Sequence, residues 1–136
     1  MRTVRICIGS EDGVNIASTH MGDTGHFYIY DLGAAGYTFV EQRNNIAQDL
    51  DHAGADKMKE ILSLVGDADV LIAQQKSPNF IKIARQTKYQ PLVVKVDTIQ
   101  AIFTLLQGEF EKIYSYVERR RNGDTFETIL ELTACS

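Results

Sequence analysis

A short apolar segment, ADVLIA at residues 68–73, constrains the fold more than any other part of the chain. A strand this apolar is expected to be covered on both faces. From Ala53 to Gly66, before this segment, apolar residues recur three and four positions apart, and after it Ser77 and Pro78 form a cap and first-turn pair typical of a helix. A buried strand between two helices predicts parallel crossovers and therefore an α/β fold.

The first third of the chain has a different apolar period. Residues 3–9 alternate, with apolar side chains at every second position. Two β-rich runs follow at 26–32 and 37–43, separated by the turn sequence GAAG. These features predict a first strand and then a hairpin of two antiparallel strands.

Strand and helix alternate again after Pro78. The helix that starts there is expected to end at 88–90, before a strand over 91–96. Asp97 is expected to cap a further helix, whose apolar spacing continues through Gly108 as far as Val117.

Alternation over 125–134 predicts a sixth, terminal strand. The sequence therefore predicts a three-layer architecture. Its mixed five-stranded sheet combines the hairpin with parallel crossovers and is flanked by helices, with a C-terminal helix and an extra strand beyond it. No repeat or linker divides residues 1–136, which are expected to form a single domain.

Composition excludes several classes of partner. The formal net charge is -4, so the chain lacks the basic field that attracts a protein to nucleic acid or to an anionic membrane. No apolar run is long enough to span a bilayer, and the N-terminus leads directly into the first predicted strand. We expect a cytoplasmic protein with neither nucleic acid nor membrane as a partner.

Catalysis also lacks support in the sequence. Cys7 and Cys135 are expected to be free thiols, and neither has a neighbour that would lower its pKa. A two-metal nuclease needs a carboxylate on the first strand, where residues 3–9 contain none. The arginines at 119–121 are expected to interact with a helix dipole rather than a ligand. A binding or carrier protein, not an enzyme, is therefore predicted.

The loop before the second strand is the most pointed candidate site. It contains His20, Gly22, Gly25 and His26 within a few residues. Imidazole is the commonest side-chain metal ligand, and glycine lets a large anionic group approach main-chain N–H groups. The alternative is that these histidines only satisfy backbone groups of the loop.

Two further segments are expected at the same end of the sheet. His52 precedes the first predicted helix, where N–H groups favour an anion, although Asp51 or His52 is equally placed to cap that helix. Lys76 and Asn79 follow the ADVLIA strand, where open α/β sheets bind their ligands. We predict that His20, His52 and the 76–79 turn approach one shared cleft.

The order of these motifs resembles the dinitrogenase iron-molybdenum cofactor biosynthesis family. The resemblance rests on His20-Met21-Gly22, the strand FYIYD ending at Asp31, His52-Ala53-Gly54 and Ser77-Pro78-Asn79. It covers most of the chain. The sequence departs from the family pattern at 74–77, where relatives often have a glycine-rich turn, and after Gly108, where it continues beyond the minimal domain.

The resemblance implies a ribonuclease H-like fold and the binding of an iron-sulfur cluster or an iron-molybdenum cofactor precursor. His20 is the implied metal ligand, together with His26 or His52, and a cluster-delivery protein is the implied partner. The competing hypothesis is a metal-free interaction or regulatory module, in which the C-terminal helix and last strand form a homodimer surface.

Overall fold

A computed structural model describes residues 3–16, 24–45, 63–74, 76 and 78–133. The strands are β1 (Thr3–Ser10), β2 (His26–Gly33), β3 (Gly36–Asn44), β4 (Val70–Ala73), β5 (Gln90–Lys95) and β6 (Leu130–Thr133). The helices are α2 (Pro78–Gln86), α3 (Ile99–Gly108) and α4 (Phe110–Arg121). The helix predicted from Ala53 lies mostly outside the described residues, which contain only its end at Ser63 and Leu64.

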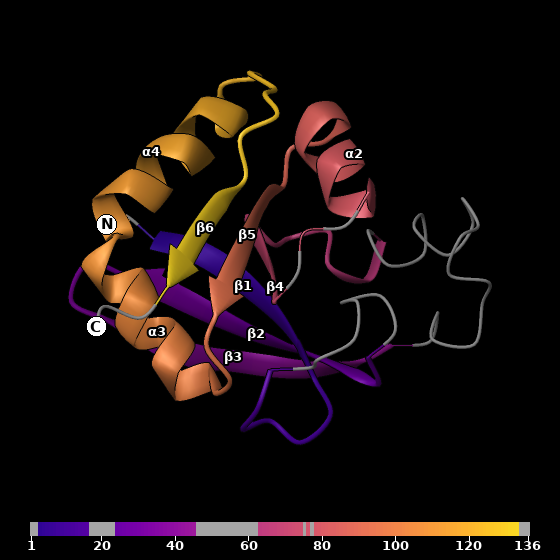
Figure 1. Ribbon diagram of the computed structural model, residues 1–136, viewed down its shortest axis with the longest axis vertical. Coiled ribbons are helices and arrows are strands. Elements are labelled where there is room, and N and C mark those ends of the chain that lie inside the picture. The colour runs from indigo at the N-terminus through magenta and orange to yellow at the C-terminus, as the bar shows by residue number, and fades with distance from the viewer. Residues whose placement is uncertain (1–2, 17–23, 46–62, 75, 77, 134–136) are drawn as a thin grey trace.

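The strands form one mixed sheet in the order β3-β2-β1-β4-β5-β6 (Figure 1). Strand β2 is antiparallel to both β1 and β3, whereas the pairs β1–β4, β4–β5 and β5–β6 are parallel. The predicted parallel set of β1, β4 and β5, with the hairpin extending one side, is confirmed. The extra strand joins the same sheet beside β5, so the described residues form a sheet of six strands rather than five.

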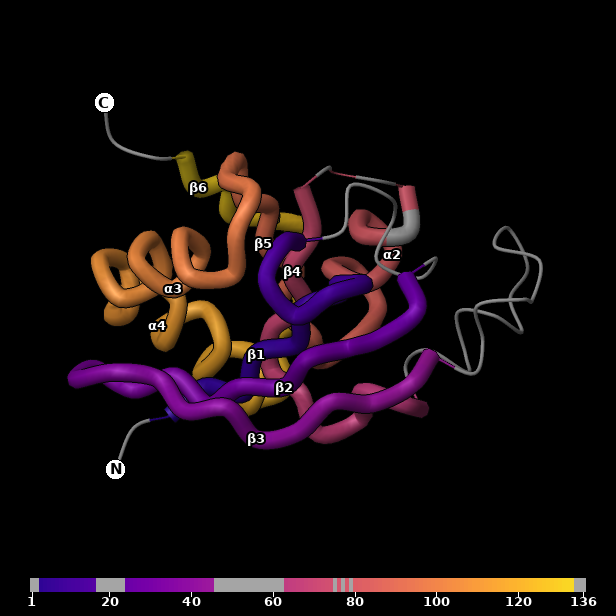
Figure 2. The backbone as a smooth tube through the Cα atoms, turned by 90° about the horizontal axis from the view of Figure 1, so that it is seen from below, coloured from indigo at the N-terminus to yellow at the C-terminus, as the bar shows by residue number. Residues whose placement is uncertain are grey.

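Helices cover both faces of the sheet, which gives three layers (Figure 2). On one face α3 and α4 pack against alternate residues of the strands, such as Ile6, Ile72 and Val94. On the other face α2 packs against the intervening residues, such as Cys7 and Leu71. All four residues of β4 are buried, as its apolar sequence predicted. The ribonuclease H-like assignment itself stays a prediction.

The long helix predicted from Asp97 to Val117 was wrong in two details. Thr98, not Asp97, caps α3, because its Oγ1 accepts the Ala101 N–H at 3.1 Å. The helix then breaks at Glu109, directly after Gly108, a residue that weakens a helix interior because its backbone loses the most freedom. The apolar spacing survives the break, since Leu106 at the end of α3 and Phe110 at the start of α4 are both buried.

The last strand begins later than its alternating sequence predicted. Residues 124–129 have no regular structure, and β6 starts only at Leu130. Side chains bind the backbone of this segment instead of a strand ladder: Arg120 donates to the Phe126 carbonyl at 3.0 Å, and Gln90 donates to the Thr128 carbonyl at 3.0 Å. These bonds satisfy carbonyls that an alternating pattern would assign to a sheet.

Arg120 is buried. This corrects the expectation that the arginines at 119–121 only interact with the dipole of α4. Its side chain donates to Gln90 Oε1 at 2.7 Å and to the carbonyls of Ala84 at 2.9 Å and Thr87 at 3.1 Å, besides Phe126. Burial, with Arg119 nearby, lowers the pKa of Arg120 to about 10, so the guanidinium is still charged at neutral pH. One side chain thus joins α2, α4, β5 and the segment before β6.

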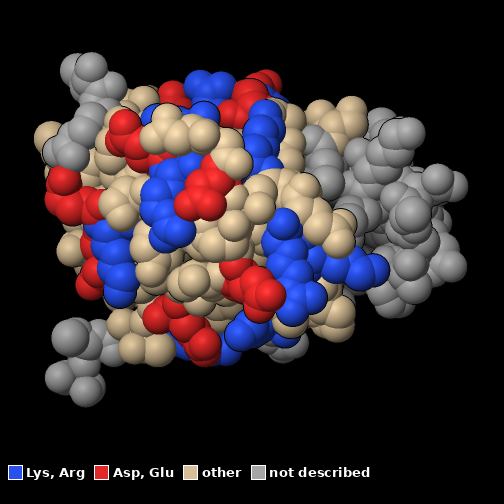
Figure 3. All heavy atoms as spheres, turned by 90° about the horizontal axis from the view of Figure 1, so that it is seen from above, with Lys and Arg blue, Asp and Glu red and all other residues tan. Residues whose placement is uncertain are grey.

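The described residues on the face drawn in Figure 3 form no large patch of one charge sign. Lysine and arginine are interspersed with aspartate and glutamate over the face drawn in Figure 3. None of the helices that the structure describes is long and apolar enough to cross a membrane.

Candidate functional site

The carboxyl ends of the parallel strands meet at one edge of the sheet. β1 ends at Ser10, β4 at Ala73 and β5 at Lys95. The antiparallel hairpin brings in two more points, because His26 at the start of β2 pairs with both Ser10 and Asn44. This carboxyl edge is the position at which open α/β sheets place their ligands.

The structure brings four of the predicted site residues to the carboxyl edge. Gly25 and His26 lie where the chain enters β2, Lys76 lies three residues after β4, and Asn79 belongs to the first turn of α2. His20, Gly22 and His52 lie outside the described residues, so the shared cleft stays a prediction for them. Their segments adjoin Ile16, Thr24 and Asn45, which the structure does describe.

The chain after β1 is held by a compact turn around Asp12. The Asp12 carboxylate accepts the N–H groups of Val14 at 2.9 Å and Asn15 at 2.8 Å. Hydrogen bonds from Asn15 and Val14 lower the pKa of Asp12 to about 2, so this carboxylate is ionised at neutral pH. Because its oxygens are engaged by the turn, Asp12 positions the backbone rather than presenting a ligand.

Hydrogen bonds across the edge fasten the segment that enters β2. Glu11 accepts the Gly25 N–H at 2.6 Å, and Asn45 donates its side-chain amide to the Thr24 carbonyl at 2.7 Å. A Cβ added at Gly25 would lie 2.8 Å from Glu11 Oε2, so the chain's own carboxylate is in close contact with this glycine, and the approach of a ligand to it stays a prediction. The sequence analysis missed Glu11 and Asn45, whose roles depend on residues far apart in the chain.

Gly9 packs directly under Thr24. A Cβ at Gly9 would lie 2.9 Å from both Cγ2 and Oγ1 of Thr24, a side chain that is itself fully buried. Because Gly9 has no side chain, residues 24–26 can pack closely against this part of β1.

We expect Gly9→Ala to destabilise the protein by roughly 1–3 kcal/mol, because the new methyl group must displace a buried, β-branched side chain. In Gly9→Ala with Thr24→Ala, both atoms at 2.9 Å are gone, and the remaining Thr24 contact is Cβ at 3.4 Å, an ordinary van der Waals distance. The double variant should therefore lose less stability than the sum of the single variants. Urea denaturation of the four proteins measures this coupling, and simple additivity would contradict the packing argument.

The turn after β4 is cross-linked to the end of β5. Gln74 donates its side-chain amide to the Val96 carbonyl at 2.9 Å, and Lys95 donates to the Gln74 carbonyl at 2.9 Å. Lys76 is exposed just beyond this crosslink, and α2 starts at Pro78 with no acidic residue in its first turn. The carboxyl edge therefore combines an ammonium group with the positive end of a helix dipole.

His26 has a defined ring orientation. Its Nδ1 lies 3.1 Å from Asn44 Oδ1, an amide oxygen that can only accept a hydrogen bond. In the tautomer that donates through Nδ1, Nε2 is the ring nitrogen left for a ligand. Metal-binding histidines commonly have this arrangement, with one ring nitrogen donating to an oxygen and the other free for the metal.

Two other polar residues from the sequence analysis have structural roles. Cys7 is fully buried, and its burial raises the pKa of the thiol, in agreement with the predicted inert side chain. Asp31, the last residue of the FYIYD motif, accepts hydrogen bonds from Arg5 at 2.9 and 3.1 Å. Among the residues that the structure describes, no three His, Cys, Asp or Glu side chains form a group that could hold a metal ion.

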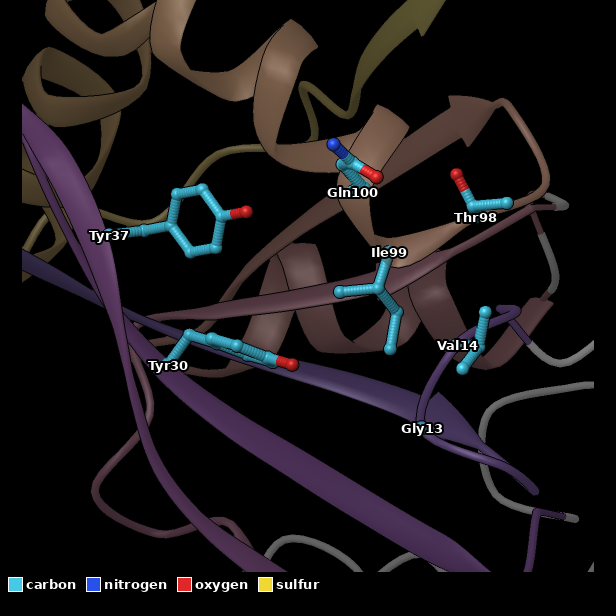
Figure 4. A pocket seen from close by; sticks show the side chains of 7 residues that line it. All are labelled: Gly13, Val14, Tyr30, Tyr37, Thr98, Ile99 and Gln100. Atoms are coloured by element: carbon cyan, nitrogen blue, oxygen red, sulfur yellow. The ribbon is translucent and has the colours of Figure 1, made fainter.

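A shallow cavity of about 350 Å³ opens between the hairpin and the start of α3 (Figure 4). Its walls are Gly13, Val14, Tyr30, Tyr37, Thr98, Ile99 and Gln100. This lining contains no imidazole, thiol or charged group, so the cavity does not suit an anionic metal cluster.

The fold defines a class of protein, an α/β protein with a mixed sheet whose parallel strands end at one edge. Within this class, the chain belongs to the dinitrogenase iron-molybdenum cofactor family, whose model matches residues 2–108. The match contains all the motifs that carried the resemblance and ends where the added C-terminal segment was predicted. No curated protein matches the chain.

Proposed function

We propose that this protein binds and carries an iron-sulfur cluster or an iron-molybdenum cofactor precursor at the carboxyl edge of its sheet. The observation on which this rests is the convergence of His26 with the Lys76 turn and the start of α2, in a chain of this family. The cluster is cargo in this proposal, and no turnover is required of the protein.

The charges at the carboxyl edge suit an anionic cargo. Lys76 is exposed there, and the N–H groups at the start of α2 favour an anion. The nearby carboxylates of Glu11 and Asp12 are occupied by backbone N–H groups, which offset their repulsion. An anion at this position therefore meets donors from one side of the site, while the ionised carboxylates on the other side have oxygens engaged by backbone N–H groups.

The metal ligands are imidazoles in this proposal. His26 Nε2 is available because Nδ1 faces Asn44, and the family resemblance adds His20 and His52. The bonds from Glu11 to Gly25 and from Asn45 to Thr24 fix the backbone beside the segments that contain those two histidines. A fixed base lowers the conformational entropy lost when a loop closes on its ligand.

Charge reversal at Lys76 tests the electrostatic part of the proposal. Lys76→Glu should weaken uptake of a cluster assembled from ferrous iron and sulfide by about tenfold or more, equivalent to about 1.4 kcal/mol of lost attraction. Lys112→Glu is the matched control, since Lys112 is an exposed residue of α4 and undergoes the same charge change. Anaerobic titration followed by charge-transfer absorbance gives the affinities. Equal affinities of the two variants would show that no anion binds beside Lys76.

A further inference from the structure

β3 is an outer strand of the sheet that the described residues form, and it pairs only with β2. Most of its residues are exposed on both faces. Tyr37, Phe39 and Val40 have exposed fractions of 43%, 52% and 37%, so the strand offers apolar side chains together with a backbone edge that pairs with no further described strand. Such an edge is a template for pairing with another strand.

The register with β2 determines which backbone groups of β3 face outward. Gly33 and Gly36 oppose each other across a two-residue turn, so this pair exchanges hydrogen bonds, and alternation makes Asp31 and Thr38 the next bonded pair. The N–H and C=O groups of Tyr37 therefore point away from β2, as do those of Phe39.

A β-bulge limits the usable part of this edge. Tyr30 pairs with Phe39 whereas Ile29 pairs with Glu41, so Val40 is the extra residue and the ladder shifts there. Regular pairing with a further strand is therefore confined to residues 36–40.

We propose that this edge pairs with the same edge of a second copy of the chain, antiparallel, about a two-fold axis at Thr38. In this register Tyr37 lies opposite the partner's Phe39, and both have outward backbone groups, so they form hydrogen-bonded pairs on either side of the axis. Thr38 faces the partner's Thr38 as a non-hydrogen-bonded pair. Residues 36–40, the part of β3 that the bulge does not disturb, can therefore pair with the same residues of the second copy.

The side chains of the edge match this register. Tyr37 stacks on Phe103 with ring centroids 4.1 Å apart, and Phe39 lies 5.4 Å from Tyr30. These four rings lie on the α3 face, so the two-fold axis joins two aromatic clusters across the new strand pair. Cross-strand aromatic pairs of this kind stabilise antiparallel sheets.

The charges favour a second copy over a charged partner. Glu41 and Arg43 lie beyond the bulge and pair within the chain, with Arg43 also bound to Asp67 at 2.6 Å. Residues 36–40 contain no charged side chain, so the symmetric register opposes no like charges. The homodimer surface predicted from the sequence lies elsewhere, on the C-terminal helix and the last strand, and it stays a separate prediction; the apolar residues of α4 pack into the core.

Dimerisation at β3 leaves the candidate site open. A two-fold axis perpendicular to the sheet reverses the strand direction, so the carboxyl edges of the two copies point to opposite ends of the continuous sheet. The interface is short, and we therefore expect a weak, concentration-dependent dimer.

Cysteine trapping tests the register. In a Cys135→Ser background, Thr38→Cys should form a disulfide-linked dimer under mild oxidation, because Cα atoms of a non-hydrogen-bonded pair lie about 4.5 Å apart. Gln42→Cys, on the same exposed strand but past the bulge, should cross-link at least about tenfold more slowly. Cys7 is buried and does not compete.

Sedimentation velocity on the protein without added cysteines provides a second readout. Phe39→Lys should raise the dimer dissociation constant by about tenfold or more, whereas Gln42→Lys, with the same charge change, should leave it within about twofold of wild type. Equal cross-linking of the two cysteine variants would overturn the proposal. A wild-type protein that stays monomeric up to about 1 mM would also overturn the proposal. This holds even if the β3 edge of that monomer pairs with a strand of a different protein.

Discussion

Arg120→Ala is expected to destabilise the protein by roughly 3–5 kcal/mol, a large part of the stability of a small domain. The guanidinium is buried and donates to Gln90 Oε1 and to three carbonyls. Its removal leaves the two buried acceptors, Gln90 Oε1 and the Ala84 carbonyl, without this donor, and each buried unsatisfied group costs about 1–3 kcal/mol. We expect residues 124–129 to detach from α2 before the rest of the protein unfolds, because Arg120 links the two.

Arg119→Ala is the matched control for this prediction. Arg119 is the preceding residue of α4 and forms an ion pair with Asp124 at 2.9 Å, but both side chains are half-exposed. Its removal should cost within about 1 kcal/mol. Urea denaturation midpoints of the two variants give the comparison, and Arg120→Lys should lie between them, since an ammonium cannot reach four acceptors. If Arg120→Ala were as mild as Arg119→Ala, the buried network would have no role in stability.

The strands could be predicted because their sequences repeat at a period of two or are wholly apolar. Residues 3–9 bury side chains toward both layers, and the hairpin after them needs only two alternating runs and a short turn. The apolar 70–73 strand is central because only a position between two neighbours covers both of its faces.

The bounds of other elements depend on tertiary contacts, which the local pattern of apolar residues does not reveal. The spacing of apolar residues from Ile99 to Val117 is the same for one helix as for two with a break at Glu109, so period alone missed the break. The alternating residues before Leu130 stay out of the sheet because Arg120 and Gln90 bind their carbonyls. Arg120 itself resembles a surface residue in sequence, since only its tertiary partners make its burial tolerable.

The candidate site was predicted in part. Topology rules place residues after parallel strands at one edge, and Gly25, His26 and Lys76 lie there. The polar anchors were not foreseen, because Glu11 and Asn45 act on residues 14 and 21 positions away, at Gly25 and Thr24. A carboxylate that fastens a loop has the same sequence appearance as one on an open surface.

His20→Ala is expected to abolish most cluster uptake while leaving the fold intact. The resemblance makes His20 the best candidate ligand of the cluster, and the sequence predicts a loop position for it, where a substitution should cost within about 0.5 kcal/mol of stability. If His20 instead only fastens its loop, its loss should cost roughly 0.5–1.5 kcal/mol and leave metal content unchanged. His26→Ala, made in the wild-type protein, tests whether His26 is a second ligand. A loss of bound iron would indicate a ligand, whereas a loss of stability alone would reflect the missing contact with Asn44.

The most direct measurement is the iron bound per chain after anaerobic reconstitution with ferrous iron and sulfide, on wild type and His20→Ala side by side, with melting temperatures of both. We predict stoichiometric iron and a brown, charge-transfer-absorbing wild type, and a variant that melts at nearly the same temperature with little iron. Equal iron in the two proteins would contradict His20 as a ligand, and no iron in either would contradict the carrier function as a whole.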